Sequence, residues 1–317
     1  QNCGAQSPKW MGKCLSCNGW NTFVEELIEK RKSGSDVAAV LSGNQPLTLE
    51  EITTERMERI GVGISEFDRV LGGGVVPGSV VLLGGEPGIG KSTLVLQVAL
   101  GLKGKKILYV SGEESLQQIK LRAGRLGMNG SNCLFLSETS LENVLAQTRQ
   151  VNPNLLIIDS IQTLAAGFLE SSPGSVTQVR ECTAAVLKLA KLNHVAVILI
   201  GHINKEGSLA GPKVLEHIVD TVLQFEGDTN YMYRILRASK NRYGSTNELG
   251  IFEMRGNGLQ EILNPSEQLI SKVSDNVSGT AVAVTVEGIR PFLIEIQALV
   301  SSAAYGTPQR SSTGFDL

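Results

Sequence analysis

Residues 80–93 read VVLLGGEPGIGKST, and this stretch decides the fold. It opens with a short, unbroken apolar run, VVLLGG, which is typical of a strand buried on both faces of a parallel sheet. The remainder matches the phosphate-loop pattern G-x-x-x-x-G-K-[ST], which connects such a strand to a helix. Glycines let backbone N–H groups wrap a phosphate, and the N-terminus of the following helix favours its negative charge. We therefore expect an α/β domain that binds a nucleotide.

Every residue of this loop is a candidate contact to ATP or ADP. The loop consists of Gly85, Glu86, Pro87, Gly88, Ile89, Gly90, Lys91, Ser92 and Thr93. The Lys91 ammonium is expected to reach the β- and γ-phosphates, and the Ser92 hydroxyl is expected to bind Mg²⁺.

Further apolar runs of the same kind follow along the chain, and helical patterns accompany them. The predicted strands cover residues 106–112, 154–160 and 195–201, and the predicted helices cover 92–102, 115–127 and 179–193. Strands that alternate with helices predict βαβ units and a right-handed, doubly wound sheet. Two more runs, at 221–228 and 231–244, indicate an antiparallel pair joined by a hairpin.

Asp159 ends the apolar run LLIID and is the candidate partner of the phosphate loop. An acidic residue at the end of a neighbouring strand holds the water shell of Mg²⁺ in nucleotide-hydrolysing enzymes of this type. A lone aspartate at a strand end also commonly caps the following turn. The phosphate loop favours the magnesium role for Asp159.

Hydrolysis also needs a residue that orients or deprotonates water, and two adjacent glutamates are candidates. Glu113 and Glu114 follow the predicted strand that ends in LYVSG. We take Glu113 as the catalytic base, with Glu114 as its supporter or substitute. The alternative is that both residues open a helix and complement its dipole.

Three cysteines, Cys3, Cys14 and Cys17, fall near the start of the chain, and the last two form a C-x-x-C knuckle. Thiolates at this spacing can face one Zn²⁺, and a second pair completes the tetrahedron. We predict a zinc ribbon, with a fourth cysteine expected before Gln1. The alternatives are a redox C-x-x-C or three idle thiols.

The 317 residues suit two or three domains. We assign residues 1–30 to the ribbon, 31–57 to a linker rich in Ser and Gly, and 58–263 to the nucleotide-binding domain. Residues 264–317, after a break at Asn264-Pro265, read as the start of another domain with two strands around an Arg-Pro turn.

Charge and hydropathy limit the surroundings of the chain. The net charge of −2 excludes a surface that is basic throughout, although a local basic channel remains compatible with it. No apolar run approaches the ~18 residues of a membrane span, and no signal peptide is visible. We expect a cytoplasmic protein with no membrane partner.

Three further features indicate a particular protein family: the ribbon, the sequence KNRYG at 240–244, and GHINKEGSLAGPKVLEHIVDT at 201–221. Together with residues 61–93, they resemble the bacterial RadA (Sms) family of DNA repair proteins over essentially the whole chain. That family has Phe where this chain has Tyr243, a conservative departure. The larger departures from the family pattern are the missing first cysteine of the ribbon and the incomplete carboxyl-terminal domain.

The resemblance implies a RecA-like P-loop ATPase core, similar to that of the helicase DnaB. The zinc ribbon precedes the core, and the start of an α+β domain resembling that of Lon protease follows it. No defensible Ser–Lys pair occurs in that last part, so proteolysis has no support. The implied function is that of a DNA-dependent ATPase and ring helicase of homologous recombination and DNA repair. As a hexameric ring on single-stranded and branched DNA, it would drive branch migration together with RecA.

The resemblance also implies roles for individual residues. Lys240 and Arg242 correspond to the charged fingers that ring helicases insert into a neighbour's nucleotide site, where a cation stabilises charge on the γ-phosphate. A DNA-binding loop is the competing interpretation of KNRYG. His202 matches the position of a γ-phosphate sensor, and its plainer alternative is an ordinary histidine at a strand end.

DNA contact is expected from two loops that face the centre of the ring. One runs from Ala165 to Thr177 and the other from Asn204 to Lys213, with Lys205 and Lys213 as phosphate contacts. The alternative is that both lysines lie on a solvated loop surface. No sequence specificity is expected from loops of this kind.

Two other functions remain open. One is a signalling or clock ATPase of the KaiC group, against which the ribbon and KNRYG argue. The other is a recruitment module that binds nucleotide without meaningful turnover. That function would give no role to four residues: Glu113, Asp159, Lys240 and Arg242.

Overall fold

The computed structural model describes residues 13, 20, 48, 58–128, 130, 132–202, 213–227, 233–270, 278–302, 306 and 310–314. The chain divides into two compact units, Gln1–Glu55 and Arg56–Leu317. In the first unit, Lys13 and Trp20 form an antiparallel bridge, and the Lys13 ammonium lies 5.7 Å from the centroid of the Trp20 ring. These two residues flank Cys14 and Cys17 in the sequence, but the cysteines themselves lie outside the described residues.

The second unit contains the α/β domain. Its strands are β1 Val80–Gly85, β2 Ile107–Ser111, β3 Cys133–Ser137, β4 Leu155–Asp159, β5 Ala196–His202, β6 Thr221–Glu226, β7 Tyr233–Asn241, β8 Leu249–Arg255, β9 Gly258–Glu261, β10 Thr280–Glu287 and β11 Arg290–Gln297. Its helices are α2 Ser65–Leu71, α3 Lys91–Gly101, α4 Leu116–Leu126, α5 Leu141–Val151, α6 Val176–Asn193, α7 Lys213–Ile218 and α8 Ser266–Leu269, with a 3₁₀ turn η1 at Ile161–Thr163.

The main sheet has the strand order β3-β2-β4-β5-β1-β6-β7-β8-β9. The first six strands in this order, β1 to β6, are parallel to one another. The last three, β7, β8 and β9, extend the sheet in antiparallel fashion. Each strand predicted from an apolar run is present, and the pair at 221–228 and 231–244 is the antiparallel pair β6–β7. The fold prediction is therefore confirmed for these elements. We did not predict the strands β3, β8 and β9 or the helices α2, α5, α7 and α8.

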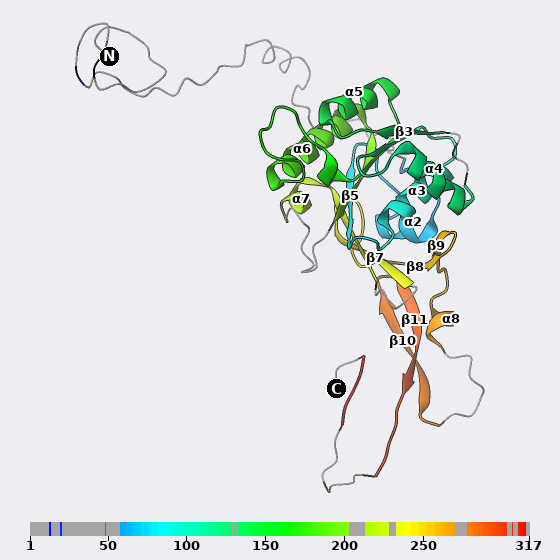
Figure 1. Ribbon diagram of the computed structural model, residues 1–317. Helices are drawn as coiled ribbons and strands as arrows, with labels where there is room; N and C mark the ends of the chain where they lie inside the picture. The colour runs from blue at the N-terminus through cyan, green and yellow to red at the C-terminus, as the bar shows by residue number, and fades with distance from the viewer. Residues whose placement is uncertain are drawn as a thin grey trace. The chain divides into compact units, whose positions relative to one another are not determined.

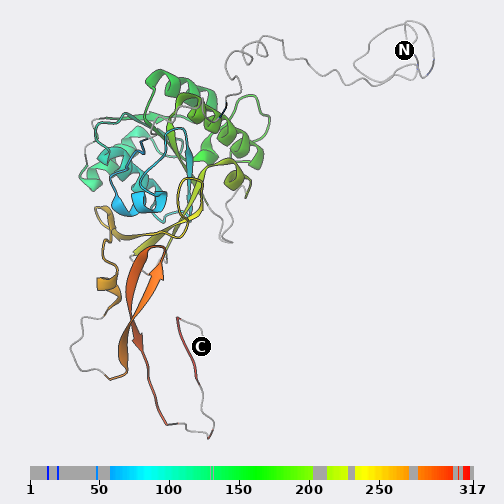
Figure 2. The ribbon, with the colours of Figure 1, turned by 180° about the vertical axis from the view of Figure 1, so that it is seen from behind.

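Helices lie on both faces of the sheet (Figure 1; Figure 2), and a separate hydrophobic core fills the space on each face. Alternate residues of β1 enter different cores: Val81 and Leu83 pack with α2, α3 and α4, whereas Val80 and Leu82 pack with α5, α6 and α7. This double burial explains why the parallel strands read as continuous apolar runs. Hydroxyl caps begin several helices, and Ser115 forms a full capping box with Gln118 at the start of α4.

Two boundaries differ from the sequence prediction. The hairpin of β10 and β11 turns at Gly288 and Ile289, whereas Arg290 and Pro291 already belong to β11. Gly288 has a φ of 64°, a conformation that glycine adopts at little cost, and this makes it the turn residue. The predicted DNA loop from Ala165 to Thr177 is also shorter, because Ser175 caps α6 and the helix begins at Val176.

The β10–β11 hairpin is attached to helix α2 of the α/β domain by an ion pair with a buried carboxylate. The carboxylate of Glu66 in α2 is fully buried and accepts a hydrogen bond of 2.9 Å from the Arg290 guanidinium. Glu66 also pairs with Arg69 at 3.1 Å and accepts from the backbone N–H of Ile251 at 3.0 Å. A second contact, from the Ile289 N–H to the Glu248 carboxylate, lies beside it.

Replacing Arg290 by methionine should lower the free energy of unfolding by about 3 kcal/mol, because it leaves a buried carboxylate with only part of its compensation. Urea denaturation followed by circular dichroism measures the change. The matched control is Arg255→Met, which breaks the exposed pair between Arg255 and Glu253 and should cost far less. Equal losses for both variants would mean that the Glu66–Arg290 pair does not anchor the hairpin.

Candidate nucleotide site

The candidate site lies where four neighbouring parallel strands end. The strand order β2-β4-β5-β1 places their carboxyl ends side by side, and Gly85 of β1 pairs directly with His202 of β5. Glu113 follows β2, Asp159 ends β4, and the phosphate loop follows β1. Ligands of open α/β sheets bind at such carboxyl ends. The topology therefore brings together residues that lie far apart in the sequence.

Strand alternation also places these side chains on one face. Every second residue of a strand points to the same face, so Asp159 shares a face with Leu155 and Ile157. Leu155 and Ile157 both pack in the core beneath α3. His202 follows Ile198 and Ile200 of that core in the same way. The face is the one covered by α3, whose first turn carries Lys91 and Ser92.

The backbone geometry of the phosphate loop requires glycine at two positions. A Cβ on Gly85 would lie 2.5 Å from the carbonyl oxygen of Phe225 in β6, so no side chain fits there. Gly90 has a φ of 114°, and a Cβ on it would lie 2.6 Å from the Met254 side chain. These positions need glycine for backbone reasons, independently of any ligand.

Lys91 is buried within the loop that it belongs to. Its Nζ donates hydrogen bonds of 2.8 Å to the carbonyl oxygens of Gly85 and Glu86. Burial lowers the pKa of Lys91 to about 8, and the carboxylates of Asp159 and Glu113 oppose that shift. The negative charges of both acids thus favour the charged form of Lys91.

Asp159 has one engaged and one free carboxylate oxygen. Its Oδ2 accepts a hydrogen bond of 2.7 Å from the Tyr109 hydroxyl, whereas its Oδ1 is buried and has no partner among the described residues. Burial raises the pKa of Asp159, and the hydroxyls of Tyr109 and Ser92 lower it. A free carboxylate oxygen beside a serine hydroxyl is an oxygen donor set that suits Mg²⁺. The residues present thus fit the predicted magnesium site.

The structure separates the two adjacent glutamates. The Glu113 carboxylate accepts from the Ser160 hydroxyl at 2.6 Å and lies 3.0 Å from Nε2 of His202. The bond with His202 is the main cause that lowers the pKa of Glu113 to about 2. Glu114 instead pairs with Arg122 of α4 at 2.5 Å, and burial raises its pKa. Glu113 therefore faces the predicted sensor His202, and Glu114 faces a helix.

Comparison with known proteins identifies the family. Residues 46–208 match the AAA domain family, and residues 1–25 match the rubredoxin metal-binding domain family. The DNA repair protein RadA of Bacillus subtilis (strain 168) is 51% identical over 321 residues, which cover 100% of this chain and 70% of that protein. RadA of Listeria monocytogenes is also 51% identical, over 318 residues.

The chain belongs to the RadA family.

Among solved structures, a KaiC-like protein from Pyrococcus horikoshii has the same fold, with a TM-score of 0.54 at 23% identity over 65% of this chain and 99% of that protein. The predicted α/β P-loop ATPase core and the amino-terminal metal-binding ribbon are confirmed. In the parts of this RadA-family chain that the structure describes, no helix is long and apolar enough to cross a membrane.

The KNRYG segment of this RadA-family chain lies at the opposite end of the sheet from its own phosphate loop. Thr221 of β6 pairs with Val81 of β1 and with Asn241 of β7, whereas Gly85 pairs with Phe225. Four residues of strand therefore separate the two ends, roughly 13 Å at the usual rise. A cation at 240–244 cannot serve the phosphates of its own protomer by a short reach.

The two cations of that segment are held differently. Lys240 donates to the carbonyl oxygens of Glu216 and Val219 at 2.6 and 2.8 Å, just where α7 ends. Arg242 pairs with the buried carboxylate of Asp220 at 3.1 Å, and half of its side chain is exposed. Lys240 is thus committed to its own protomer, and Arg242 is the more available of the two.

The predicted DNA contacts are described only in part. Residues 203–212, which include Lys205, lie outside the described residues, and of Lys213 the structure describes only that it begins α7. The first predicted loop is ordered at its base by the Gln178 amide, which bonds to Ala166 and Ser171. At its tip Phe168 is 65% exposed.

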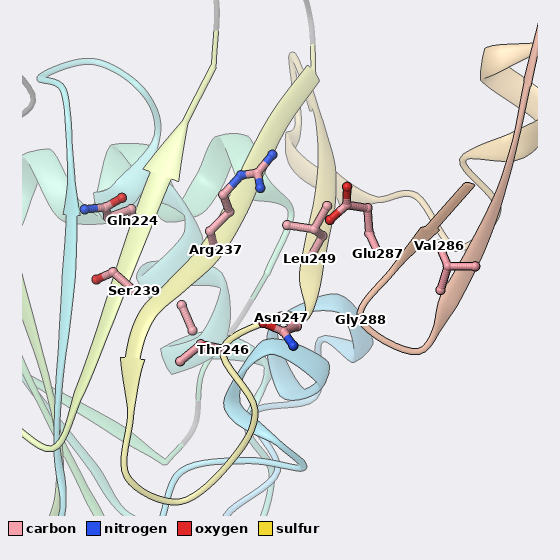
Figure 3. A pocket seen from close by; sticks show the side chains of 10 residues that line it. Gln224, Arg237, Ser239, Thr246, Asn247, Leu249, Val286, Glu287 and Gly288 are labelled. Atoms are coloured by element: carbon pink, nitrogen blue, oxygen red, sulfur yellow. The ribbon is translucent and has the colours of Figure 1, made fainter. Parts of the chain in front are cut away.

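A polar pocket of about 520 Å³ lies apart from these residues, between the β6–β8 part of the sheet and the turn of the β10–β11 hairpin (Figure 3). Gln224, Arg237 and Ser239 line it from the sheet, and Glu287 and Gly288 line it from the hairpin. Gln224 points away from the face on which Leu223 and Phe225 pack with α3. The pocket therefore lies on the other face of the sheet from the candidate nucleotide site.

Replacing Glu113 by glutamine should lower the rate of ATP hydrolysis by roughly 10²–10⁴-fold while nucleotide binding persists, because the amide cannot accept a proton from water. Steady-state phosphate release measures turnover, and a fluorescent ATP analogue measures binding. Glu114→Gln is the matched control and should change turnover only a few-fold. The assignment of Glu113 would be wrong if Glu114→Gln caused the large loss of turnover and Glu113→Gln only the small one.

Proposed function

We propose that this chain is a DNA-dependent ATPase and ring helicase of homologous recombination and DNA repair, which drives branch migration of recombination intermediates together with RecA. The observation that carries the proposal is the convergence of Lys91, Asp159, Glu113 and His202 at adjacent strand ends in a RadA-family chain. ATP provides the energy, and single-stranded and branched DNA are the substrates in this proposal.

Each residue has a distinct task in the proposed hydrolysis. Lys91 binds the β- and γ-phosphates, and the loop N–H groups that begin α3 hold the phosphate oxygens. Ser92 and Asp159 hold Mg²⁺, which supplies charge neutralisation at the phosphates when it is bound. Glu113 is ionised throughout the physiological range, so it orients the attacking water and accepts its proton late in the reaction.

His202 connects this chemistry to the rest of the domain in the proposal. Its Nε2 contacts Glu113, and its buried Nδ1 has no hydrogen-bond partner among the described residues. A γ-phosphate near this imidazole would compete for the proton that Nε2 shares with Glu113. We assign His202 as the sensor that reports the nucleotide state to the residues that follow β5, where Lys205 and Lys213 are the proposed DNA contacts.

Arg242 acts in trans in this proposal. Its distance along the sheet from the phosphate loop excludes a short reach within one protomer, and its exposure leaves it accessible to a neighbour. Asp220 pairs with one nitrogen of the guanidinium, and half of the arginine side chain stays exposed. Head-to-tail contacts of this kind close into rings, and we propose a hexamer. The finger role for Lys240 has less support, because its ammonium is bound at the end of α7.

The two ends of the chain extend the proposal. Cys3, Cys14 and Cys17 lie within the match to the rubredoxin metal-binding domain family, and thiolates favour Zn²⁺ among the common metals. Residues 264–317 contain the antiparallel hairpin β10–β11, which we propose to be the start of the Lon-like domain.

DNA coupling is tested by steady-state ATPase activity with and without single-stranded DNA. We expect DNA to stimulate turnover, and Lys91→Ala to abolish it because the loop loses its phosphate-facing cation. Turnover that ignores DNA would favour a signalling ATPase over a DNA motor. Nucleotide binding with no turnover in either condition would favour a recruitment module.

The trans role of Arg242 is tested by mixing two inactive variants. In a mixed ring of Arg242→Ala and Lys91→Ala protomers, an intact loop from the first can meet an intact arginine from the second. Random mixing in equal amounts places that pair at about a quarter of the interfaces, so about a quarter of the activity should return. If KNRYG acts on its own protomer, mixing restores nothing. Arg255→Ala, an exposed arginine elsewhere, should stay active alone.

A further inference from the structure

We infer that Tyr109 is a positioning residue of the magnesium site, which holds the Asp159 carboxylate by one oxygen and keeps the other oxygen free for Mg²⁺ and its water shell. The inference rests on the proposed ATPase function of this same site. It adds a residue that the phosphate-loop pattern and the strand-end acid do not reveal.

The register of the sheet sets the approach of the two side chains. Tyr109 of β2 pairs with Ile157 of β4, and Ser111 pairs with Asp159. Tyr109 and Asp159 thus belong to adjacent strands, two residues apart along them, and both lie on the face of α3. A phenol is long enough to cover that offset, and its hydroxyl donates to Oδ2 of Asp159 at 2.7 Å.

Packing fixes the phenol in this position. Tyr109 is 1% exposed, and its ring lies 5.6 Å from the ring of Phe135 in the neighbouring strand β3. Asp159 is 3% exposed. Solvent therefore does not compete strongly for either group, and the hydroxyl has a carboxylate oxygen as its acceptor. The hydrogen bond restrains the rotation of the carboxylate about its last torsion.

The two carboxylate oxygens of Asp159 therefore have different roles in this inference. Oδ2 is engaged by the phenol, and the buried Oδ1 accepts no hydrogen bond among the described residues. The Ser92 hydroxyl lies close enough to Asp159 to interact with it. A carboxylate that is already oriented loses less freedom when the metal binds, and partners of this kind typically change metal affinity by about 10–100-fold.

A purely structural role is the alternative, in which Tyr109 only satisfies a buried carboxylate and fills the core. The two roles differ in what the hydroxyl does to metal affinity. Tyr109→Phe removes the hydroxyl and keeps the ring, so it separates them with little change of packing.

The test measures Mn²⁺ as a stand-in for Mg²⁺, by electron paramagnetic resonance of the full chain with ADP. For Tyr109→Phe we expect a dissociation constant for Mn²⁺ about tenfold higher, together with a higher Mg²⁺ concentration for half-maximal ATPase. Saturating Mg²⁺ should restore most of the turnover. A lower melting temperature with unchanged Mn²⁺ affinity would overturn the inference and leave Tyr109 a core residue only.

Two further variants make the result specific. Tyr233→Phe removes a tyrosine hydroxyl at the start of β7 and should leave Mn²⁺ affinity unchanged. In an Asp159→Asn background, Tyr109→Phe should weaken Mn²⁺ binding no further, because its effect passes through Asp159. An additive effect there would contradict the inference. A wild-type chain that binds no ADP would instead refute the proposed function.

Discussion

The central position of β1 is the constraint on which the rest of the structure depends. β5 and β6 pair with both of its edges, and separate cores cover both of its faces. The neighbouring backbone comes so close that Gly85 has no room for a Cβ beside Phe225. Pairing on both edges sets the register of β1, and this places the phosphate loop and the first turn of α3 beside the ends of β4 and β5. Strand pairing and close packing therefore set the position of the loop where the phosphates would bind.

Such a site gathers buried charges that must compensate one another. The charges of Lys91, Asp159 and Glu113 influence one another's pKa values. Burial disfavours the charged forms of Lys91 and Asp159. Two hydroxyls and one imidazole offset part of that cost by hydrogen bonding to the carboxylates. Among the described residues, Oδ1 of Asp159 has no hydrogen-bond partner, which agrees with its proposed role toward Mg²⁺.

The sequence was sufficient to locate this site but not to arrange it. Residues buried on both faces give continuous apolar runs, so the strands and the groups at their ends, Asp159 and Glu113, were predictable. β3 was missed because it lies at the edge of the sheet, where its side chains are partly exposed. Glu113 and Glu114 have the same local context, and only the distant Arg122 and His202 distinguish them. The Tyr109 contact was invisible for the same reason, since it depends on the order and register of strands.

The position of the KNRYG segment gives the strongest argument that one protomer is an incomplete enzyme. In the proposed function, hydrolysis takes place at the carboxyl ends of the parallel strands, whereas Arg242 pairs with Asp220 at the other end. Asp220 also accepts from the backbone N–H of Val80, so the arginine is tied to the strand that carries the phosphate loop. In the proposed ring, Asp220 would thus connect the strand that carries the phosphate loop of one protomer to the guanidinium proposed to act on a neighbour. In a closed ring, this link would make each site sensitive to the state of the next.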